Sequence, residues 1–371
     1  MRKGVLVVLD SANRGGAERL VATTVSQLPR DRYEPVVVSL SPSNRLEAYQ
    51  ALDVPVVSIP VETRRDLYGA IRRLRTLIRR RNIRVVHTHL PVADFVGRLA
   101  AIGLARVVTT LHKGSEESVD GIPPRVQPPG WLDGLTRRRG VDHYLAVSDA
   151  VKLSVEAQLG LSGVETLPHF IDVHGFHEKV ASVDRTVVRR SLGLDESDVV
   201  LLHVGRFTRD KAQAHLLTSF REAHLEDGRL RLLLAGEGPE MVSTRALAEE
   251  LGLGDRVAFL EATPDVLSLY RAADMFVFPS RAQSFGIALL EAMAAGLPSV
   301  VTWVGGVREI TSRETSLIVE VDHATELARA IIRLAKDPFL RQKMGRLAAV
   351  RAMAFDVSEW LPRLEAVYDS V

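Results

Sequence analysis

Short apolar segments rich in β-branched residues alternate with helix-period segments along most of the chain. The predicted strands cover residues 4–9, 35–40, 83–88, 107–111 and 143–147, and then 199–204, 230–235, 257–260, 275–278 and 299–302. Between them apolar residues recur at helical spacing, for example over 17–28, 214–224, 240–251 and 286–295. This alternation is typical of parallel sheets with helices on both faces.

The alternation pauses where charged and polar residues dilute the apolar pattern, at about residues 172–197. A chain of 371 residues is long enough for two domains. We therefore predict an α/β protein with two Rossmann-like, doubly wound parallel-sheet domains that face each other across a cleft. The predicted parts are an N-terminal domain (1–172), a linker and entry to the second domain (173–197), a C-terminal domain (198–353), and a C-terminal helix that crosses back to the first domain (354–371). The segment 114–131 contains four prolines and is predicted as an irregular loop, either passive or shaping an acceptor site.

Composition narrows the class of protein. The chain is 46% hydrophobic and 25% charged, as expected for a folded globular protein. It has no cysteine, which excludes disulfides, thiolate nucleophiles and cysteine-ligated metals. The apolar run at the start ends at Asp10, too early for a signal-peptide core, and no apolar stretch is long enough to span a bilayer. We therefore expect a cytoplasmic protein.

Positive charge is concentrated between Arg64 and Arg84, where nine arginines accompany a single acidic residue. Apolar residues at helical spacing in this segment predict a helix packed on the core. Its expected outward arginines are Arg72, Arg73, Arg75, Arg79, Arg80 and Arg81. Such a face is either ordinary solvated surface or a peripheral contact with an anionic membrane. A nucleic-acid partner is disfavoured, because the segment lacks interleaved aromatics and a recognisable module.

Candidate ligand-binding residues lie directly after predicted strands, where ligands bind in doubly wound sheets. Gly15 and Gly16 follow the first strand and open a helix, but they do not form the G-x-G-x-x-G pattern of nicotinamide cofactor sites. Gly205, Arg206 and Lys211 follow the first strand of the second half, and two cations there suit a diphosphate. Ordinary surface cations are the alternative.

A polar turn follows the strand at 275–278 and leads into an apolar helix. Ser284, Phe285 and Gly286 stand where the free amides at the helix start would meet a phosphate. Glu291 lies inside the helix, where a carboxylate is costly unless it is hydrogen-bonded. Either a ribose diol or a structural partner would satisfy it.

These motifs, taken in order, resemble the retaining glycosyltransferases of family 4, which have the GT-B fold. The resemblance extends over almost the whole chain, through Gly-Gly-Ala-Glu at 15–18, His-Thr-His at 87–89, Leu-His at 111–112, Val-Ser at 147–148, Gly-Arg at 205–206 with Lys211, Gly-Glu-Gly-Pro at 236–239, the segment 280–298 and Gly-Gly at 305–306.

The resemblance implies a role for each matching residue. Arg206 and Lys211 would hold the donor diphosphate and stabilise the leaving group, and His112 would contact the donor sugar near the reacting carbon. The expected donor-binding residues are Gly15, Gly16, Gly205, Gln283, Ser284, Phe285, Gly286 and Glu291. One departure is Gln283, because the family usually has a glutamate there; glutamine still forms hydrogen bonds but carries no charge. A second is Glu261, where the family often has a small residue. His87 and His89 are expected to support the strand ends rather than to bind metal.

We therefore expect a retaining, metal-independent transferase that moves a hexose-type sugar from a nucleotide-diphosphate sugar, with UDP favoured. The expected acceptor is a lipid-linked or soluble glycan in cell-surface polysaccharide or glycolipid synthesis, and the protein would lie on the inner face of the membrane. No cofactor, metal or nucleic acid is expected. The alternatives are a GT-B-fold sugar-nucleotide epimerase and a nucleotide-sugar-binding protein with weakened catalysis. A hydrolase is disfavoured, because no pair of acidic residues of the hydrolase type is evident.

Overall fold

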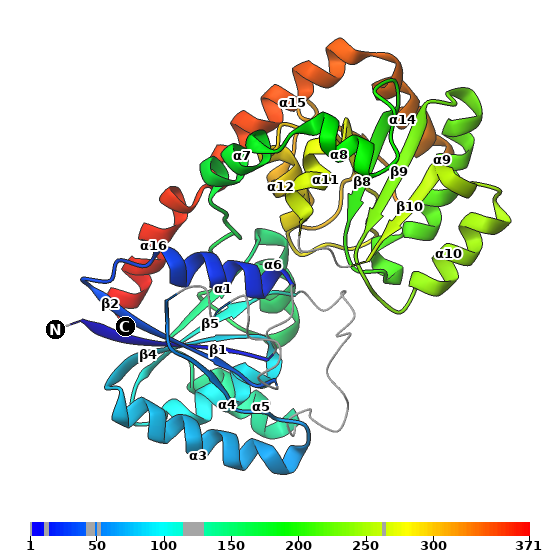
Figure 1. Cartoon of the computed structure of the whole chain (residues 1–371). Helices are drawn as coiled ribbons and strands as arrows, with labels where there is room; N and C mark the ends of the chain where they lie inside the picture. The colour runs from blue at the N-terminus through cyan, green and yellow to red at the C-terminus, as the bar shows by residue number, and fades with distance from the viewer. Residues whose placement is uncertain (1, 11–14, 42–48, 50–52, 114–129, 262–264) are drawn as a thin grey trace. The chain divides into compact units, whose positions relative to one another are not determined.

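The computed structural model describes residues 2–10, 15–41, 49, 53–113, 130–261 and 265–371. The chain divides into two compact units (Figure 1). The first contains Met1–Phe170 and Val357–Val371, and the second contains Ile171–Asp356.

The first unit contains a seven-stranded parallel sheet of order β3-β2-β1-β4-β5-β6-β7. Its strands are β1 (Lys3–Leu9), β2 (Tyr33–Ser39), β3 (Val56–Ser58), β4 (Ile83–His89), β5 (Arg106–Leu111), β6 (His143–Ala146) and β7 (Glu165–Thr166). Its helices are α1 (Gly16–Gln27), α3 (Arg64–Arg80), α4 (Pro91–Ala101), α5 (Gly130–Arg139), α6 (Asp149–Leu159) and α16 (Val357–Ser370).

Strand β1 shows why the first sheet is covered on both faces. Val5 and Val7 pack in a cluster with α1 and α16, whereas Leu6 and Val8 pack in another cluster with α3 and α4. Successive side chains of a strand point to opposite faces, so a strand buried on both faces becomes a continuous apolar run.

The second unit contains a six-stranded parallel sheet of order β10-β9-β8-β11-β12-β13. Its strands are β8 (Val199–Val204), β9 (Leu230–Ala235), β10 (Val257–Leu260), β11 (Met275–Phe278), β12 (Ser299–Thr302) and β13 (Ser316–Val319). Its helices are α7 (Val173–Ser182), α8 (Arg185–Ser191), α9 (Gln213–Glu226), α10 (Met241–Glu250), α11 (Val266–Ala272), α12 (Ile287–Ala294), α13 (Val307–Ile310), α14 (Ala324–Lys336) and α15 (Pro338–Ala352).

The ten predicted strands are confirmed, with ends that agree to within two residues. The strands absent from the prediction are β3, β7 and β13, which all lie at sheet edges. They are two to four residues long and only partly buried, so they lack the apolar run that marks a central strand. The predicted proline-rich loop lies outside the described residues, except for its last two, which begin α5.

The segment expected as a linker forms helices α7 and α8, which belong to the second unit. Arg185 donates hydrogen bonds to the carbonyl oxygens of Arg271 and Ala273, and buried Arg189 donates one to the carbonyl of Asp198. The charged residues that dilute the apolar pattern here therefore hold these helices against the second sheet.

The C-terminal helix α16 belongs to the first unit, where it runs beside α1 (Figure 1). Leu361, Leu364, Val367 and Tyr368 are buried in the cluster that also contains β1 and α1. The Tyr368 hydroxyl group lies 2.7 Å from Nδ1 of His87 on β4. The last residues of the chain thus complete the core of the first unit.

Helix α3 has the predicted amphipathic pattern, with Leu67, Leu74 and Ile78 buried. Five of the arginines expected to face outward are exposed, but Arg75 is not. Its guanidinium donates to the carbonyl oxygens of Ala100 and Ile102 at 3.1 and 3.0 Å, and thereby caps the C-terminal end of α4. Among the described residues, no helix is long and apolar enough to cross a membrane.

We predict that Leu364→Ala lowers the stability of the first unit by about 2–5 kcal/mol, because it leaves a cavity under α16. Hydrogen exchange in urea should show faster exchange of β1 and β4 amides and unchanged exchange of β8 and β9. The control is Val350→Ala on α15, where the side chain is 71% exposed. Equal effects of the two substitutions would contradict the role assigned to α16.

Candidate functional site

The predicted site residues lie at the carboxyl ends of the strands, in two separate groups. His112 follows β5, and Gly15 and Gly16 begin α1, all in the first unit. The other predicted residues follow β8 and β11 in the second unit: Gly205, Arg206, Lys211, Gln283, Ser284, Phe285, Gly286 and Glu291.

In the first group, His112 belongs to a row of hydrogen-bonded histidines. Its Nε2 lies 2.8 Å from Nδ1 of His89, and its Nδ1 lies 3.3 Å from Nε2 of His169. A neutral imidazole has one N–H, so His112 donates to one neighbour and accepts from the other. The tautomers of the three rings are therefore coupled, and both nitrogens of His112 have partners within the protein.

Burial keeps these histidines uncharged. Desolvation lowers the pKa of His112 to about 3, and it lowers the pKa values of His89 and His169 well below the usual value. His87 is buried beside His89, with its ring nitrogens 2.7 Å from the hydroxyl groups of Tyr368 and Thr110. His87 thus supports the strand ends, as predicted.

Asp10 stands directly after β1 and caps α4. Its carboxyl oxygens accept hydrogen bonds from the backbone N–H groups of Val92 and Ala93. Burial raises the pKa of Asp10 to about 8. Gly15 is the N-cap of α1, where a Cβ atom would lie 2.4 Å from a carboxylate oxygen of Glu18. Gly16 is exposed in the first turn of α1.

In the second group, Arg206 and Lys211 have different surroundings. Arg206 is exposed, and its guanidinium has no hydrogen-bond or ion-pair partner within the described part of the chain. The side chain of Lys211 is only 17% exposed and lies between two acceptors. Its Nζ is 2.8 Å from Oδ2 of Asp210 and 2.6 Å from Oε1 of Gln283. Burial raises the pKa of Asp210, but the charge of Lys211 and the hydrogen bonds from Lys211, Thr208 and the backbone together outweigh this effect, so the pKa is lowered.

The loop after β8 is held from two sides. Buried Gln213 donates from Nε2 to the carbonyl oxygen of Arg206 at 2.7 Å, and the same Nε2 lies 3.2 Å from Nε2 of His203. On the other side Gly236 has a φ of +142°, and a Cβ atom there would lie 2.0 Å from the carbonyl oxygen of Gly205. Only glycine allows the two backbones to approach this closely.

Residues 284–286, which form the turn before α12, are enclosed within the second unit. Ser284 and Phe285 are buried, and the ring of Phe285 packs edge-on against Phe355 with centroids 5.6 Å apart. Gly286 is the N-cap of α12 with a φ of +110°. Glu291 is buried one turn later, with Oε2 2.9 Å from the Tyr270 hydroxyl group. The structure thus supplies one of the two kinds of partner expected for Glu291.

Several site residues were not found from the sequence. Asp10 follows a predicted strand directly, so its position alone was a usable signal. His169 lies close after β7, an edge strand that the pattern did not reveal. Asp210 and Gln213 flank Lys211 in the sequence, but only the folded loop shows what their side chains contact.

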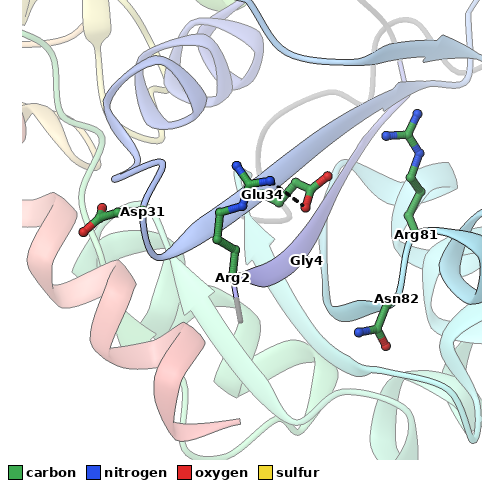
Figure 2. A pocket seen from close by; sticks show the side chains of 6 residues that line it. All are labelled: Arg2, Gly4, Asp31, Glu34, Arg81 and Asn82. Atoms are coloured by element: carbon green, nitrogen blue, oxygen red, sulfur yellow. Dashed lines mark ion pairs between the residues drawn. The ribbon is translucent and has the colours of Figure 1, made fainter.

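Two other features do not form a site. No group of three or more His, Asp or Glu residues in the described ranges could hold a metal ion. A depression of about 560 Å³ lies at the amino ends of β1, β2 and β4. The predicted site residues of the first unit lie at the opposite, carboxyl ends of the strands. Arg2 forms an ion pair with Glu34 at 3.6 Å. Figure 2 shows Asp31 and Arg81 on either side of this pair, with neither side chain directed at it. The charged groups that line this depression therefore do not converge on a ligand.

Because the histidines are neutral when folded, we predict that acid destabilises the first unit. Below pH 6.5 the unfolded histidines take up protons, whereas folded His87 and His112 stay neutral down to about pH 3. Each histidine should therefore lower the stability as the pH falls from 6.5 towards 3, by up to about 1.4 kcal/mol per pH unit, and Asp10, whose pKa is raised, should offset part of this loss. His87→Asn should reduce the slope of the urea midpoint against pH, unlike His174→Asn at an exposed position. Identical slopes in all three proteins would refute this explanation.

Comparison with known proteins identifies the family of this chain. Residues 14–174 match the family described as Glycosyltransferase Family 4, and residues 184–351 match Glycosyl transferases group 1. An N-acetyl-alpha-D-glucosaminyl L-malate synthase of Bacillus anthracis is 31% identical over 72% of this chain and 70% of its own length. A D-inositol 3-phosphate glycosyltransferase of Pseudarthrobacter chlorophenolicus is 32% identical over 72% of this chain and 66% of its own length.

Among solved structures, Anabaena Alr3699/HepE in complex with UDP-glucose superposes with a TM-score of 0.84. The alignment covers 99% of this chain and 100% of that one, at 19% sequence identity, and so shows a shared fold. The family matches, the curated relatives and the two parallel-sheet units together show that the chain belongs to glycosyltransferase family 4 and has the GT-B fold.

Proposed function

We propose that this glycosyltransferase is a retaining, metal-independent hexosyltransferase that uses a nucleotide-diphosphate sugar, with UDP as the nucleotide. The observation that carries the proposal is the pair of cations after β8, the exposed Arg206 and the enclosed Lys211. When the bond between the anomeric carbon and the phosphate oxygen breaks, negative charge develops on the departing diphosphate. Fixed cations beside it stabilise that charge without a metal ion.

The remaining donor contacts follow from the same loops. The backbone N–H groups at the start of α12 suit a phosphate, and Glu291 suits the hydroxyl groups of a ribose. UDP is favoured because the solved structure of Anabaena Alr3699/HepE is a complex with UDP-glucose. Retention of the anomeric configuration is proposed from the membership of family 4.

For the acceptor, we propose a lipid-linked glycan in cell-surface polysaccharide or glycolipid synthesis. The support is the exposed arginine face of α3, which suits an anionic membrane surface. The names of the two relatives contain L-malate and D-inositol 3-phosphate, so a small soluble acceptor is the competing possibility.

We predict that Arg206→Ala and Lys211→Ala each lower the rate of UDP release from UDP-sugars by about 10²–10³-fold, the loss seen when one donor to a developing anion is removed. UDP release without acceptor, with a panel of UDP-sugars, is a suitable measurement. Arg209→Ala is the matched control, because this side chain is 90% exposed in the same loop. Chelator should leave the rate unchanged.

Three results would count against the proposed chemistry. They are wild-type rates in both variants, a strict requirement for a divalent metal, and formation of an epimeric nucleotide sugar in place of free UDP. The last would favour an epimerase.

We predict that the protein sediments with vesicles containing anionic lipid and not with neutral vesicles, and that high salt releases it. Replacing Arg72, Arg73, Arg79 and Arg80 by glutamine should abolish binding. Arg329→Gln with Arg333→Gln is the control, because both arginines are exposed on α14 in the second unit. Binding that survives high salt, or is equal on neutral vesicles, would exclude an electrostatic contact and favour the soluble acceptor.

A further inference from the structure

The contact between Lys211 and Gln283 determines which atoms of Gln283 are left for a ligand. An ammonium group only donates hydrogen bonds, so the amide atom 2.6 Å from Lys211 Nζ must be the oxygen. The Nε2 amino group of Gln283 therefore points away from Lys211. No described residue accepts a hydrogen bond from it, and the side chain is partly exposed.

The backbone of Gln283 is fixed in a way that keeps this orientation. The N–H of Gly306 donates to the carbonyl oxygen of Gln283 at 3.0 Å. A Cβ atom on Gly305 would lie 2.0 Å from that same oxygen, so two glycines after β12 allow the backbone to pack directly on the turn. On the other side of the ammonium, Asp210 accepts from Lys211 at 2.8 Å. Gln283 and Asp210 together hold the Lys211 ammonium in place.

We propose that Gln283 has two functions: its oxygen positions Lys211, and its N–H groups select a donor sugar that presents a hydrogen-bond acceptor to them. The inference rests on the proposed function of this loop as the donor site. A glutamate at position 283 would keep the first function, because a carboxylate accepts from lysine. It would reverse the second, because a carboxylate requires a sugar hydroxyl group that donates.

Sugar analogues separate these two directions of hydrogen bonding. A deoxyfluoro analogue keeps an acceptor and loses the donor, whereas a deoxy analogue loses both. For UDP-glucose modified at each hydroxyl position in turn, we expect one position where the deoxy analogue binds about 3- to 10-fold more weakly than the fluoro analogue, as measured by calorimetry. In Gln283→Glu the two analogues should bind equally at that position, and both more weakly than UDP-glucose.

The positioning function has its own readout. Gln283→Met removes the acceptor for Lys211 and should lower kcat for UDP release about tenfold or more, while the Kd for UDP changes less than threefold. Gln283→Glu should restore kcat to within about threefold of wild type. Gln342→Glu, the same change at an exposed position on α15, should alter neither quantity.

The possible failures are distinguishable. If neither UDP nor UDP-glucose, UDP-galactose or UDP-N-acetylglucosamine binds, the proposed donor site itself is wrong. If UDP-glucose binds but the fluoro and deoxy analogues are equal at every position in the wild type, the selection function is wrong. If Gln283→Met keeps the wild-type kcat, Gln283 does not position Lys211.

Discussion

The parallel pairing of β8 with β9 and β11 is the constraint on which the candidate donor site depends. Its register sets Val204 beside Ala235 and Leu202 beside Phe276, so the three strands end at nearly the same level. The loops that follow must then pack against one another at the sheet edge. Gly236 permits that packing by letting its backbone meet the loop after β8. The pairing of the strands thus fixes the loop that carries Arg206 and Lys211.

The two units place different polar residues after their strands. In the first unit, burial keeps His89, His112 and His169 neutral and joins them by hydrogen bonds. In the second unit, Lys211 has a carboxylate partner and Arg206 reaches solvent. Burial disfavours the charged form of a side chain, whereas a nearby opposite charge favours it. The positive charge that the proposed mechanism needs therefore lies after β8.

Much of this arrangement could be predicted from sequence, for reasons that differ by residue. Central strands such as β8 appear as continuous apolar runs because both of their faces are buried. Arg206 and Lys211 could be placed at the carboxyl end of the sheet because they follow such a strand closely in the sequence. Arg75 was expected to face outward, since its position in the helical pattern does not reveal that the end of α4 lies within its reach. Edge strand β7 escaped detection because it is short and partly exposed.

The sequence by itself determined the alternation of strands and helices, the division into two parallel sheets, and the strand ends that the candidate site residues follow. These features follow from local hydrophobic periodicity, which can be read directly along the sequence. Only the tertiary structure decided that Gln283 faces Lys211, that His112 has histidines on both sides, and that Tyr368 completes the first unit. These contacts join residues distant in sequence, and hydrogen bonds between them depend on distances that no local pattern encodes.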